Sequence, residues 1–571
     1  MPTKITLAAP RASRTTLLYL HARLHSVAVL LVVAALLAAP AHGRLINDSA
    51  GNSAAELRQQ LKSQLSADST GSDDLNRQSV DSIVQSFYAE RSFRPAWTTH
   101  AQQLELRQLP RLAELHGLTA TEYQLPAVTR EFADVAAVAR LELQISRTVL
   151  TIATHLRYGK MEPAGKYTRL RVQYDDAART EMLHSAAASE SLLIYLNNLA
   201  PQDLLYRKLQ HSLAGHRTMR DDGLESPRIK AGRTLEPGMR DTRVPQLRQR
   251  LGLEPVADDA DLYDAPLAAA VARFQQRHRL QADGIVGPRT RRTLNISLSR
   301  RIAQLRVNLE WQRWARTPAG TDYLRVNIPH YTLQWVEDGR SQWSMRTQVG
   351  NKDRQTPVFR SVVNAISANP TWTIPPTIFR EDILPLLQTD AAYLQQKGMY
   401  VVDRRGRPVD AGLIDWQTTT ADEFPYRLRR GPGLGNALGS MKFMMPNPYL
   451  IYLHDTPAKH LFRQPTRATS SGCIRVEEPQ QLAEFLVSMQ KQRSQQRLVK
   501  AMSTNKTRYI GFDAPVPIII LYATIDLNDE GELIFADDIY HRDRQVLAVL
   551  NSTQAQQPDT LIASLGGRPG G

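Results

Sequence analysis

Cysteine is almost absent from this chain of 571 residues, because Cys473 is the only one. A single cysteine excludes an intramolecular disulfide, and with it the disulfide frameworks on which small secreted domains depend. An isolated cysteine is most often a small buried hydrophobic residue or a neutral accident. The residues around Cys473 must therefore decide whether its thiol is a nucleophile.

Long apolar runs are also scarce. The longest, residues 27–39, falls short of the roughly 20 residues that a membrane-spanning helix requires. Small residues follow it at 40–43, and basic residues precede it at Lys4, Arg11, Arg14 and Arg23. This order of charge, apolar run and small residues is typical of a secretory signal. We expect residues 1–43 to direct export, and the sequence leaves open whether the segment is cleaved or retained as an anchor.

Acidic residues are outnumbered, with 56 Asp and Glu against 71 Lys and Arg, for a formal net charge of +15. A basic surface suits a polyanion such as nucleic acid, an anionic membrane face or an acidic cell-wall polymer. Export argues against nucleic acid as a partner. The length predicts about three or four domains of ~150 residues each.

Composition and periodicity predict where these domains lie. The expected order is a flexible linker at 44–75, a helical scaffold domain at 76–215, a second linker at 216–241, a small helical unit at 243–296, a β-rich domain at 321–545 and a disordered tail at 551–571. Within the β-rich domain, residues 378–430 are polar and helix-prone with little strand pattern. We interpret them as a lid-like insertion.

The unit at 243–296 combines two stretches of helical periodicity with Asp-Gly and Gly-Pro turns and the start of a third helix. Its pattern resembles the three-helix peptidoglycan-binding module attached to many wall enzymes. The residues that carry this resemblance are Phe274-Gln275, Leu280, Asp283-Gly284, Val286-Gly287 and Thr290. A small helical bundle without a ligand is the alternative, and nothing in the unit looks catalytic.

The most informative segment runs from Ile451 to Val476. It holds His454, followed by Asp-Thr-Pro, and later Ser-Ser-Gly-Cys-Ile-Arg at 470–475. A nucleophilic cysteine needs an imidazole or a positive neighbourhood for thiolate character, and N–H donors for the developing oxyanion. His454 is the candidate base, Gly472 lets a carbonyl approach the backbone, and Arg475 adds positive charge.

This order, with a His–Cys spacing of 19, resembles the signature of YkuD-type L,D-transpeptidases. Further matching residues are Asn369-Pro370-Thr371-Trp372, Pro375-Pro376, Pro432-Gly433, Asn436-Ala437-Leu438-Gly439, Lys442-Phe443, Pro446-Asn447 and Tyr452-Leu453. Together they resemble the large, YcbB-like branch over about residues 80 to 545. Many family members have His directly before Gly-Cys, where this chain has Ser471, so the base is His454 rather than an adjacent histidine.

The resemblance implies an α+β multidomain fold, with a helical scaffold, a three-helix peptidoglycan-binding module and a β-rich catalytic domain bearing the insertion. It implies 3→3 cross-linking of peptidoglycan by acyl transfer. Cys473 attacks the third residue of a tetrapeptide stem and D-Ala leaves with a proton from His454. The side-chain amine of a second stem then resolves the thioester.

The resemblance also suggests further site residues. The amide of Cys473, with Gly472 or Tyr452, would hold the oxyanion, and the carbonyl of Asp455 would orient His454. Arg475 is expected to organise the site. The implied substrate-binding residues are Tyr452, Ser470, Ser471, Trp372 and Asn436. Turn formation is the alternative for the two serines, and core packing is the alternative for Trp372.

No cofactor or metal is implied. The implied partners are peptidoglycan stems as donor and acceptor, and carbapenem β-lactams as inhibitors. The implied location is the periplasm, with inner-membrane association left open together with the fate of the signal.

Other classes of protein fit the sequence less well. A serine penicillin-binding enzyme needs Lys-Thr-Gly, which is absent, although Ser-x-x-Lys occurs at Ser488–Lys491 and Ser503–Lys506. A zinc D,D-peptidase needs clustered ligands, and no His-Glu-x-x-His appears. The non-enzyme alternative is a catalytically inactive peptidoglycan-binding scaffold protein, against which the intact Cys473, His454 and Gly472 argue.

Overall fold

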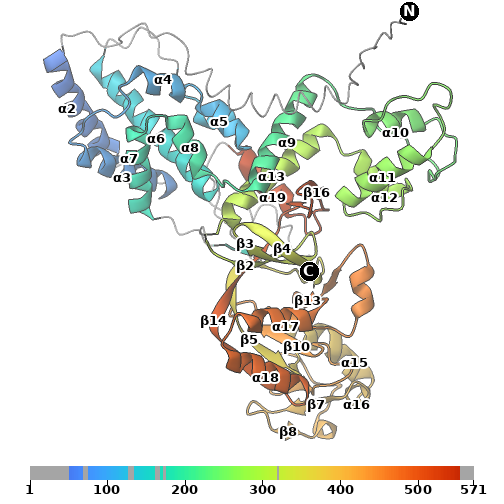
Figure 1. Ribbon diagram of the computed structural model, residues 1–571. Coiled ribbons are helices and arrows are strands. Elements are labelled where there is room, and N and C mark those ends of the chain that lie inside the picture. Colours follow the sequence, from blue (N-terminus) through green and yellow to red (C-terminus); the bar gives the residue numbers. More distant parts are fainter. Residues whose placement is uncertain are drawn as a thin grey trace, which may run out of the picture.

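The computed structural model describes residues 50–68, 75–126, 134–160, 168–170, 175–317 and 320–552. The predicted export segment and almost all of the predicted tail lie outside these residues. The chain forms a helical region and a small helical module on opposite sides of a junction, with a β-rich domain below them (Figure 1). The predicted fold class is confirmed.

The helical region is built around one long amphipathic helix, α6. Asp134 caps its N-terminus by accepting a hydrogen bond from the amide of Ala136, and its apolar stripe is buried. The elements of this region are α2 (Ala50–Asp68), α3 (Leu75–Glu90), α4 (His100–Leu106), α5 (Leu109–Leu115), η1 (Ala120–Tyr123), α6 (Val135–Tyr158), β1 (Thr168–Arg169), α7 (Asp176–Ala188), α8 (Leu192–Leu199) and α9 (Leu204–Asp221).

The prediction of a flexible linker at 44–75 is wrong for its central part, because residues 50–68 form α2. Leu61 and Leu65 are buried in the main core, and the Gln64 amide donates to the carbonyl of Ala136 at the start of α6. The polar composition concealed this helix because only one narrow face is buried. Two leucines one helical turn apart are enough for α2 to pack against α6.

The small module consists of α10 (Val244–Arg250), α11 (Ala265–Arg277) and α12 (Pro288–Leu294) around a separate core. The Gln275 side chain fixes the turn before α12, because its amide donates to the Ile285 carbonyl and its oxygen accepts from the amide of Gly284. Gly284 has φ +71°, a conformation that favours glycine.

The predicted linker at 216–241 is wrong at both ends. Helix α9 continues to Asp221, and Ile229 and Leu235 belong to the core of the module. Leu235 forms an isolated β-bridge with Val286, which brings this segment against the turn that precedes α12. Residues 216–241 contain few apolar side chains, so composition alone did not indicate that this segment packs against the module.

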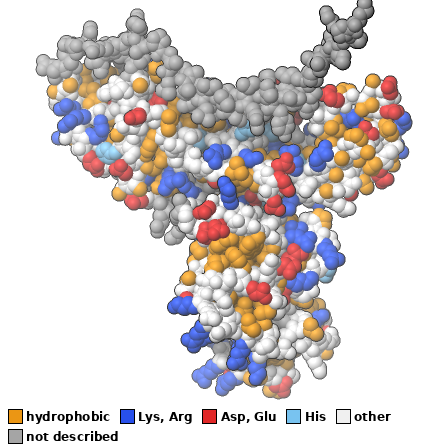
Figure 2. All heavy atoms as spheres, viewed as in Figure 1, with side chains coloured by type: hydrophobic (Ala, Val, Ile, Leu, Met, Phe, Trp, Pro, Cys, Tyr) orange, Lys and Arg blue, Asp and Glu red, His pale blue; other side chains and the backbone are white. Residues whose placement is uncertain are grey.

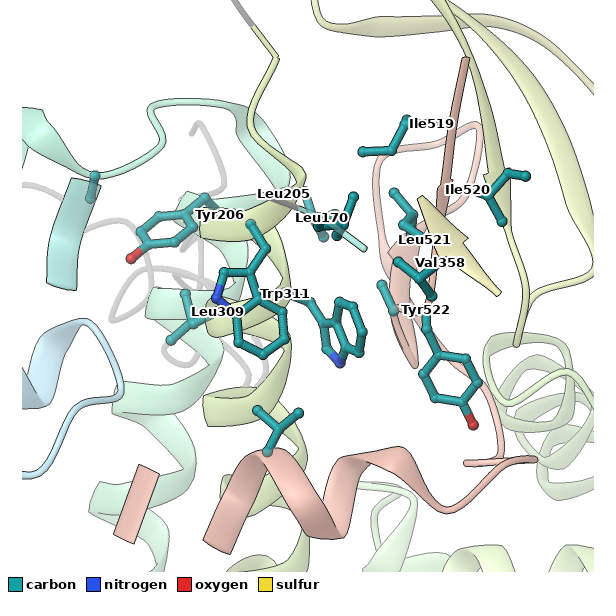
Figure 3. Packing of buried hydrophobic residues seen from close by; sticks show 14 of the residues in the cluster. Leu170, Leu205, Tyr206, Leu309, Trp311, Val358, Ile519, Ile520, Leu521 and Tyr522 are labelled. Carbon is teal, nitrogen blue, oxygen red and sulfur yellow. The ribbon is translucent and has the colours of Figure 1, made fainter. Parts of the chain in front are cut away.

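Helix α13 (Leu298–Ala315) joins the helical region to the β-rich domain. Its Trp311 packs between Leu205 and Tyr206 on the helical side and Tyr522 on the sheet side (Figure 3). The rings of Trp311 and Tyr522 are 6.0 Å apart. One hydrophobic core therefore runs from the helical region through α13 into the sheet, where the sequence suggested two separate domains.

The β-rich domain contains a mixed sheet that closes on itself, because β14 pairs with both β2 and β5. Its strand order is β1-β5-β10-β11-β13-β4-β3-β2-β14, with β12 paired to β4. The strands are β2 (Tyr323–Asn327), β3 (Thr332–Glu337), β4 (Arg340–Gly350), β5 (Val358–Ala368), β10 (Met441–Met444), β11 (Leu453–His454), β12 (Ala468–Ser470), β13 (Ile474–Val476) and β14 (Arg508–Leu521).

Further elements surround this sheet. They are η4 (Lys459–Arg463), α17 (Pro479–Ser488), α18 (Gln492–Met502), β15 (Ile525–Leu527), β16 (Leu533–Phe535) and α19 (Arg542–Asn551). Among the helices of the described residues, none combines the length and hydropathy that crossing a bilayer demands.

The insertion at 378–430 contains strands, so the expectation that it has little strand structure is wrong. Its sheet has the order β6-β9-β7-β8, and it encloses its own core around Phe379, Leu387 and Trp416. The elements are β6 (Trp372–Thr373), α14 (Pro376–Ile378), η2 (Phe379–Ile383), α15 (Leu384–Thr389), α16 (Tyr393–Gln396), β7 (Met399–Val402), β8 (Pro408–Val409), η3 (Ala411–Leu413) and β9 (Arg427–Arg430). These strands are too short for clear alternation to show in the sequence.

Basic side chains gather at the lower end of the β-rich domain (Figure 2). This end carries the insertion and α18, whose exposed basic residues are Arg404, Arg405, Arg407, Arg493, Arg497 and Lys500. Part of the excess positive charge of the chain is therefore concentrated here, where it would attract a polyanion.

The buried ion pair of α13 offers a test of how the helical region is held. The Arg313 guanidinium binds the Glu310 carboxylate and also donates to the Tyr206 hydroxyl and the His116 carbonyl, at 2.8 and 2.9 Å. Replacing Arg313 with Met should cost about 3–5 kcal/mol, because it removes the cation that offsets the buried charge of Glu310.

Thermal unfolding of Arg313→Met checks this prediction. The double variant Glu310→Gln/Arg313→Met should recover much of the loss. Arg407→Met, which breaks the exposed pair with Asp403, is the matched control and should leave the midpoint almost unchanged. A midpoint for Arg313→Met equal to that of the control would contradict the prediction.

Candidate active site

The site is built on the parallel pairing of β11 with β13. In this register Leu453 lies opposite Ile474 and His454 lies opposite Arg475, and the Ile474 amide donates to the Tyr452 carbonyl at 3.2 Å. Cys473, directly before β13, is thereby placed next to Tyr452. Since side chains alternate along a strand, Tyr452 and His454 share a face, and their rings are 5.6 Å apart. Cys473 and His454 therefore lie on the same face of neighbouring strands, diagonal to one another.

His454 is buried and neutral. Burial, with the charge of Arg475 beside it, lowers its pKa to about 3. Its Nδ1 lies 2.5 Å from the carbonyl oxygen of Asp455, an acceptor that requires the ring proton to sit on Nδ1. The lone pair of Nε2 is therefore free to accept a proton, which is the tautomer that a general base needs.

Cys473 is half-buried. Burial raises the pKa of its thiol, while the backbone amide and phenol of Tyr452 and the charges of Lys442 and Arg475 act in the opposite direction. Burial also raises the pKa of Tyr452, so its hydroxyl stays a donor beside the sulfur. The resting site therefore holds a neutral thiol next to a neutral imidazole, with the means to stabilise a thiolate.

Hydrogen bonds from two side chains hold the turn that carries Cys473. Ser470 is buried, and its hydroxyl donates to the Cys473 carbonyl at 2.5 Å and accepts from the Gly472 amide at 3.1 Å. Thr356 donates from its hydroxyl to the Gly472 carbonyl at 2.8 Å. Gly472 has φ +108°, which a residue with a side chain rarely adopts. Ser470 is thus a turn former, and the Gly472 amide is already engaged.

Ser471 lies on the exposed side of this turn, where Arg354 reaches it. The Arg354 guanidinium donates to the Ser471 hydroxyl at 3.0 Å and also binds the carboxylates of Glu381 and Asp382, each at 2.6 Å. Both acids belong to η2 of the insertion. One side chain therefore links the insertion to the turn at residues 470–473, which we call the nucleophile turn after the predicted role of Cys473.

The remaining predicted residues have mainly structural contacts. The Asp455 carboxylate accepts from the amide and hydroxyl of Ser440 and from Lys459, so only its carbonyl serves His454. Asn436 is buried, and its amide nitrogen donates to the carbonyls of Pro370 and Gly431 while its oxygen accepts from Leu438. Both amide protons of Asn436 are thus engaged with the backbone, and its predicted role in substrate binding stays a prediction.

Trp372 lies in β6, where it packs against the core of the insertion. The structure gives it no contact with Cys473 or His454 in the described residues. Its predicted role as a substrate platform therefore stays a prediction.

Sequence reasoning missed several residues of the site. Lys442 belongs to the matching motif but was assigned no role. Nothing in the sequence near Thr356, Arg354 or Gln348, whose side-chain oxygen accepts from Arg475, points to Cys473. These residues come from β4, β10 and the loop after β4, and only the strand order brings them to the site. Within the described ranges, no three or more His, Cys, Asp or Glu side chains come together as a metal site.

Comparison with known families agrees with this geometry. Residues 321–511 match the model described as L,D-transpeptidase catalytic domain (YkuD), residues 82–213 match a scaffold domain, and residues 246–294 match a "Putative peptidoglycan binding domain". The chain therefore carries a YkuD L,D-transpeptidase catalytic domain together with a scaffold domain and a peptidoglycan-binding domain.

Among curated proteins, the chain is similar to a "Putative L,D-transpeptidase" of Haemophilus influenzae, with 37% identity over 227 residues. The match covers 40% of this chain and spans 46% of the relative, less than half its length. Among solved structures, the L,D-transpeptidase (residues 123–326) of Xylanimonas cellulosilytica matches with 15% identity and a TM-score of 0.17, over 51% of this chain and 98% of that one. At that TM-score the superposition supports no argument.

The neutral resting pair predicts how Cys473 reacts with iodoacetamide. Alkylation should be slow at neutral pH and accelerate above the ordinary thiol pKa of about 8.5, because burial raises the pKa of Cys473. His454, with a pKa of about 3, should add no step between pH 5 and 8.

Intact-protein mass spectrometry across pH measures this rate, and Cys473→Ala supplies the background because the chain has no other cysteine. Full reactivity already at pH 6, as expected for a preformed thiolate–imidazolium pair, would contradict the assignment.

Proposed function

We propose that this protein is a peptidoglycan L,D-transpeptidase that forms 3→3 cross-links by acyl transfer through Cys473. The observation that carries the proposal is the β11–β13 pairing, which places Cys473 on the same face as a neutral His454 of the neighbouring strand, whose Nδ1 proton is held by the Asp455 carbonyl. The match of residues 321–511 to an L,D-transpeptidase catalytic domain supports the substrate class.

In the first step the Cys473 sulfur attacks the carbonyl carbon of the third residue of a tetrapeptide stem. His454 Nε2 takes the thiol proton as the C–S bond forms, and the carbonyl oxygen becomes an oxyanion. When the oxyanion collapses, the C–N bond breaks and His454 returns the proton to the leaving amine. D-Ala departs and a thioester remains on Cys473.

In the second step the neutral side-chain amine of another stem attacks the thioester carbonyl. His454 accepts a proton from that amine, and the expelled thiolate takes it back when the new amide forms. The cycle thus ends with a neutral thiol and a neutral imidazole, the state in which it began. Burial of both groups favours this uncharged resting state.

The oxyanion needs donors that the fold has already positioned. The Gly472 amide donates to Ser470, so the Cys473 amide and the Tyr452 hydroxyl would hold the oxyanion instead. Tyr452 lies against Cys473, and its raised pKa keeps the hydroxyl protonated. The expectation that Gly472 supplies an amide donor is therefore replaced, while its role in the turn remains.

We further propose that the protein works in the periplasm, exported by its N-terminal segment, with the small module holding glycan strands near the site. The match of residues 246–294 to a peptidoglycan-binding domain supports that role for the module. The helical region and sheet share one core, so the catalytic domain and its support would act as one rigid body.

Reaction with a carbapenem tests the nucleophile. Intact-protein mass spectrometry of the purified protein should show a single adduct, and Cys473→Ala should show none. Incubation with tetrapeptide-bearing muropeptides should then yield 3→3 dimers. An adduct that survives in Cys473→Ala, or no adduct at all, would favour the inactive peptidoglycan-binding scaffold protein.

We also propose that the insertion at 378–430 gates entry of the stem peptide, with Arg354 as its tether to the nucleophile turn. The contacts of Arg354 with Glu381 and Asp382 are partly exposed, so each should be worth at most about 1 kcal/mol. Glu381→Gln/Asp382→Asn should therefore increase the rate of carbapenem acylation, by up to about tenfold.

The acylation rate is measured by stopping the reaction at successive times and determining the acylated fraction by mass spectrometry. Asp422→Asn is the matched control, because Asp422 pairs with Arg380 inside the insertion and does not touch Arg354. An acylation rate that stays the same in the double variant, or changes equally in the control, would rule out the tether.

A further inference from the structure

Three positive or potentially positive side chains form a row across the site. In the register of the sheet, Lys442 of β10 lies opposite His454 of β11, and His454 lies opposite Arg475 of β13. Residues paired in this way point to the same face of a sheet. Lys442 and Arg475 therefore lie on the two sides of His454, on the face that carries Tyr452 next to Cys473.

Neither cation of this row has an acidic partner among the described residues. The Lys442 ammonium lies 3.8 Å from the centre of the Tyr452 ring and forms no ion pair. Arg475 donates to the neutral oxygen of Gln348 at 3.0 Å, and its buried Nε has no hydrogen-bond partner. The carboxylate of Asp455, the residue directly after β11, is engaged by Ser440 and Lys459.

Two other arginines that the fold removes from water have acidic partners. Arg313 binds Glu310, and Arg325 binds Asp526. Cations that are removed from water without a counter-charge are costly, and an anion arriving between them would offset that cost. Lys442 and Arg475 are both at least half-buried, so this cost applies to both.

We propose that Lys442 and Arg475 form a carboxylate subsite that receives the C-terminal carboxylate of the donor stem. This assignment rests on the proposed function. In a tetrapeptide donor the leaving nitrogen and the terminal carboxylate are attached to the same α-carbon. The carboxylate is thus three bonds from the carbonyl carbon that Cys473 attacks, within the same site.

The subsite would select donors by length. One additional residue beyond the scissile bond moves the terminal carboxylate by up to about 3.6 Å, out of reach of a pair of cations fixed on the sheet. Stems with a single residue after the scissile carbonyl would therefore be preferred over longer stems. The selection would arise from the distance between the chain end and the reacting carbonyl.

Binding of a carboxylate would also assist the chemistry. The charges of Arg475 and Lys442 both oppose protonation of His454. An anion between them offsets that effect, so the imidazole becomes a stronger base once a donor is bound. The same anion also offsets the effect of the two cations on the Cys473 thiol, so the proton would pass to His454 as the C–S bond forms rather than before it.

A comparison of two donors tests the subsite, namely a tetrapeptide stem with a free C-terminal carboxylate and the same stem as the C-terminal amide. Mass spectrometry follows thioester formation, and initial rates give kcat and KM for each. Wild type should prefer the acid by about 10- to 100-fold in kcat/KM, as expected for a hydrogen-bonded charge. In Lys442→Met this preference should shrink to a few fold, and Lys442→Arg should restore most of it.

The control is Lys491→Met, an exposed lysine outside the site, which should keep the wild-type preference. An acid-to-amide ratio that is unchanged in Lys442→Met would overturn the subsite. Equal losses on both donors, with alkylation of Cys473 shifted to higher pH, would assign Lys442 to the thiolate and also overturn it. If wild type forms a thioester with neither donor, the proposed function itself fails.

Discussion

The site depends on one constraint, the parallel pairing of two short strands inside a closed sheet. Strand β11 has two residues and β13 has three, so neither could hold its place alone. They are fixed because β10 and β4 flank them and β14 closes the sheet through β2 and β5. The geometry of Cys473 and His454 is therefore a property of the whole sheet rather than of the turn between them.

Burial then determines the charge states. Desolvation makes both the Cys473 thiol and the His454 imidazole neutral, and the hydrogen bond to the Asp455 carbonyl selects the tautomer. Reactivity arises only when charge develops, since Tyr452, Lys442 and Arg475 favour the thiolate. A lone thiol benefits from this arrangement, because a protonated cysteine is less easily oxidised than a thiolate.

The other parts of the chain differ in how firmly they are attached to the sheet that carries this site. The shared core around Trp311 couples the helical region to the sheet, so the two cannot move independently without breaking that packing. The insertion, by contrast, has its own core and meets the nucleophile turn through the partly exposed contacts of Arg354. The helical region is thus attached rigidly to the catalytic sheet, and the insertion is attached weakly. A gate over the site would need such a weakly attached segment on a rigid support.

The sequence by itself determined the fold class, the nucleophile candidate and its base, because a lone cysteine in a Gly-Cys turn and a histidine at fixed spacing are local patterns. It also indicated the long strands, where alternation is clear. Helix α2, the short strands of the insertion and the extent of the module were decided by tertiary packing, since each buries only a few side chains. Lys442, Arg354 and Thr356 join the site only through strand order, and the neutral state of His454 depends on burial, which no local pattern encodes.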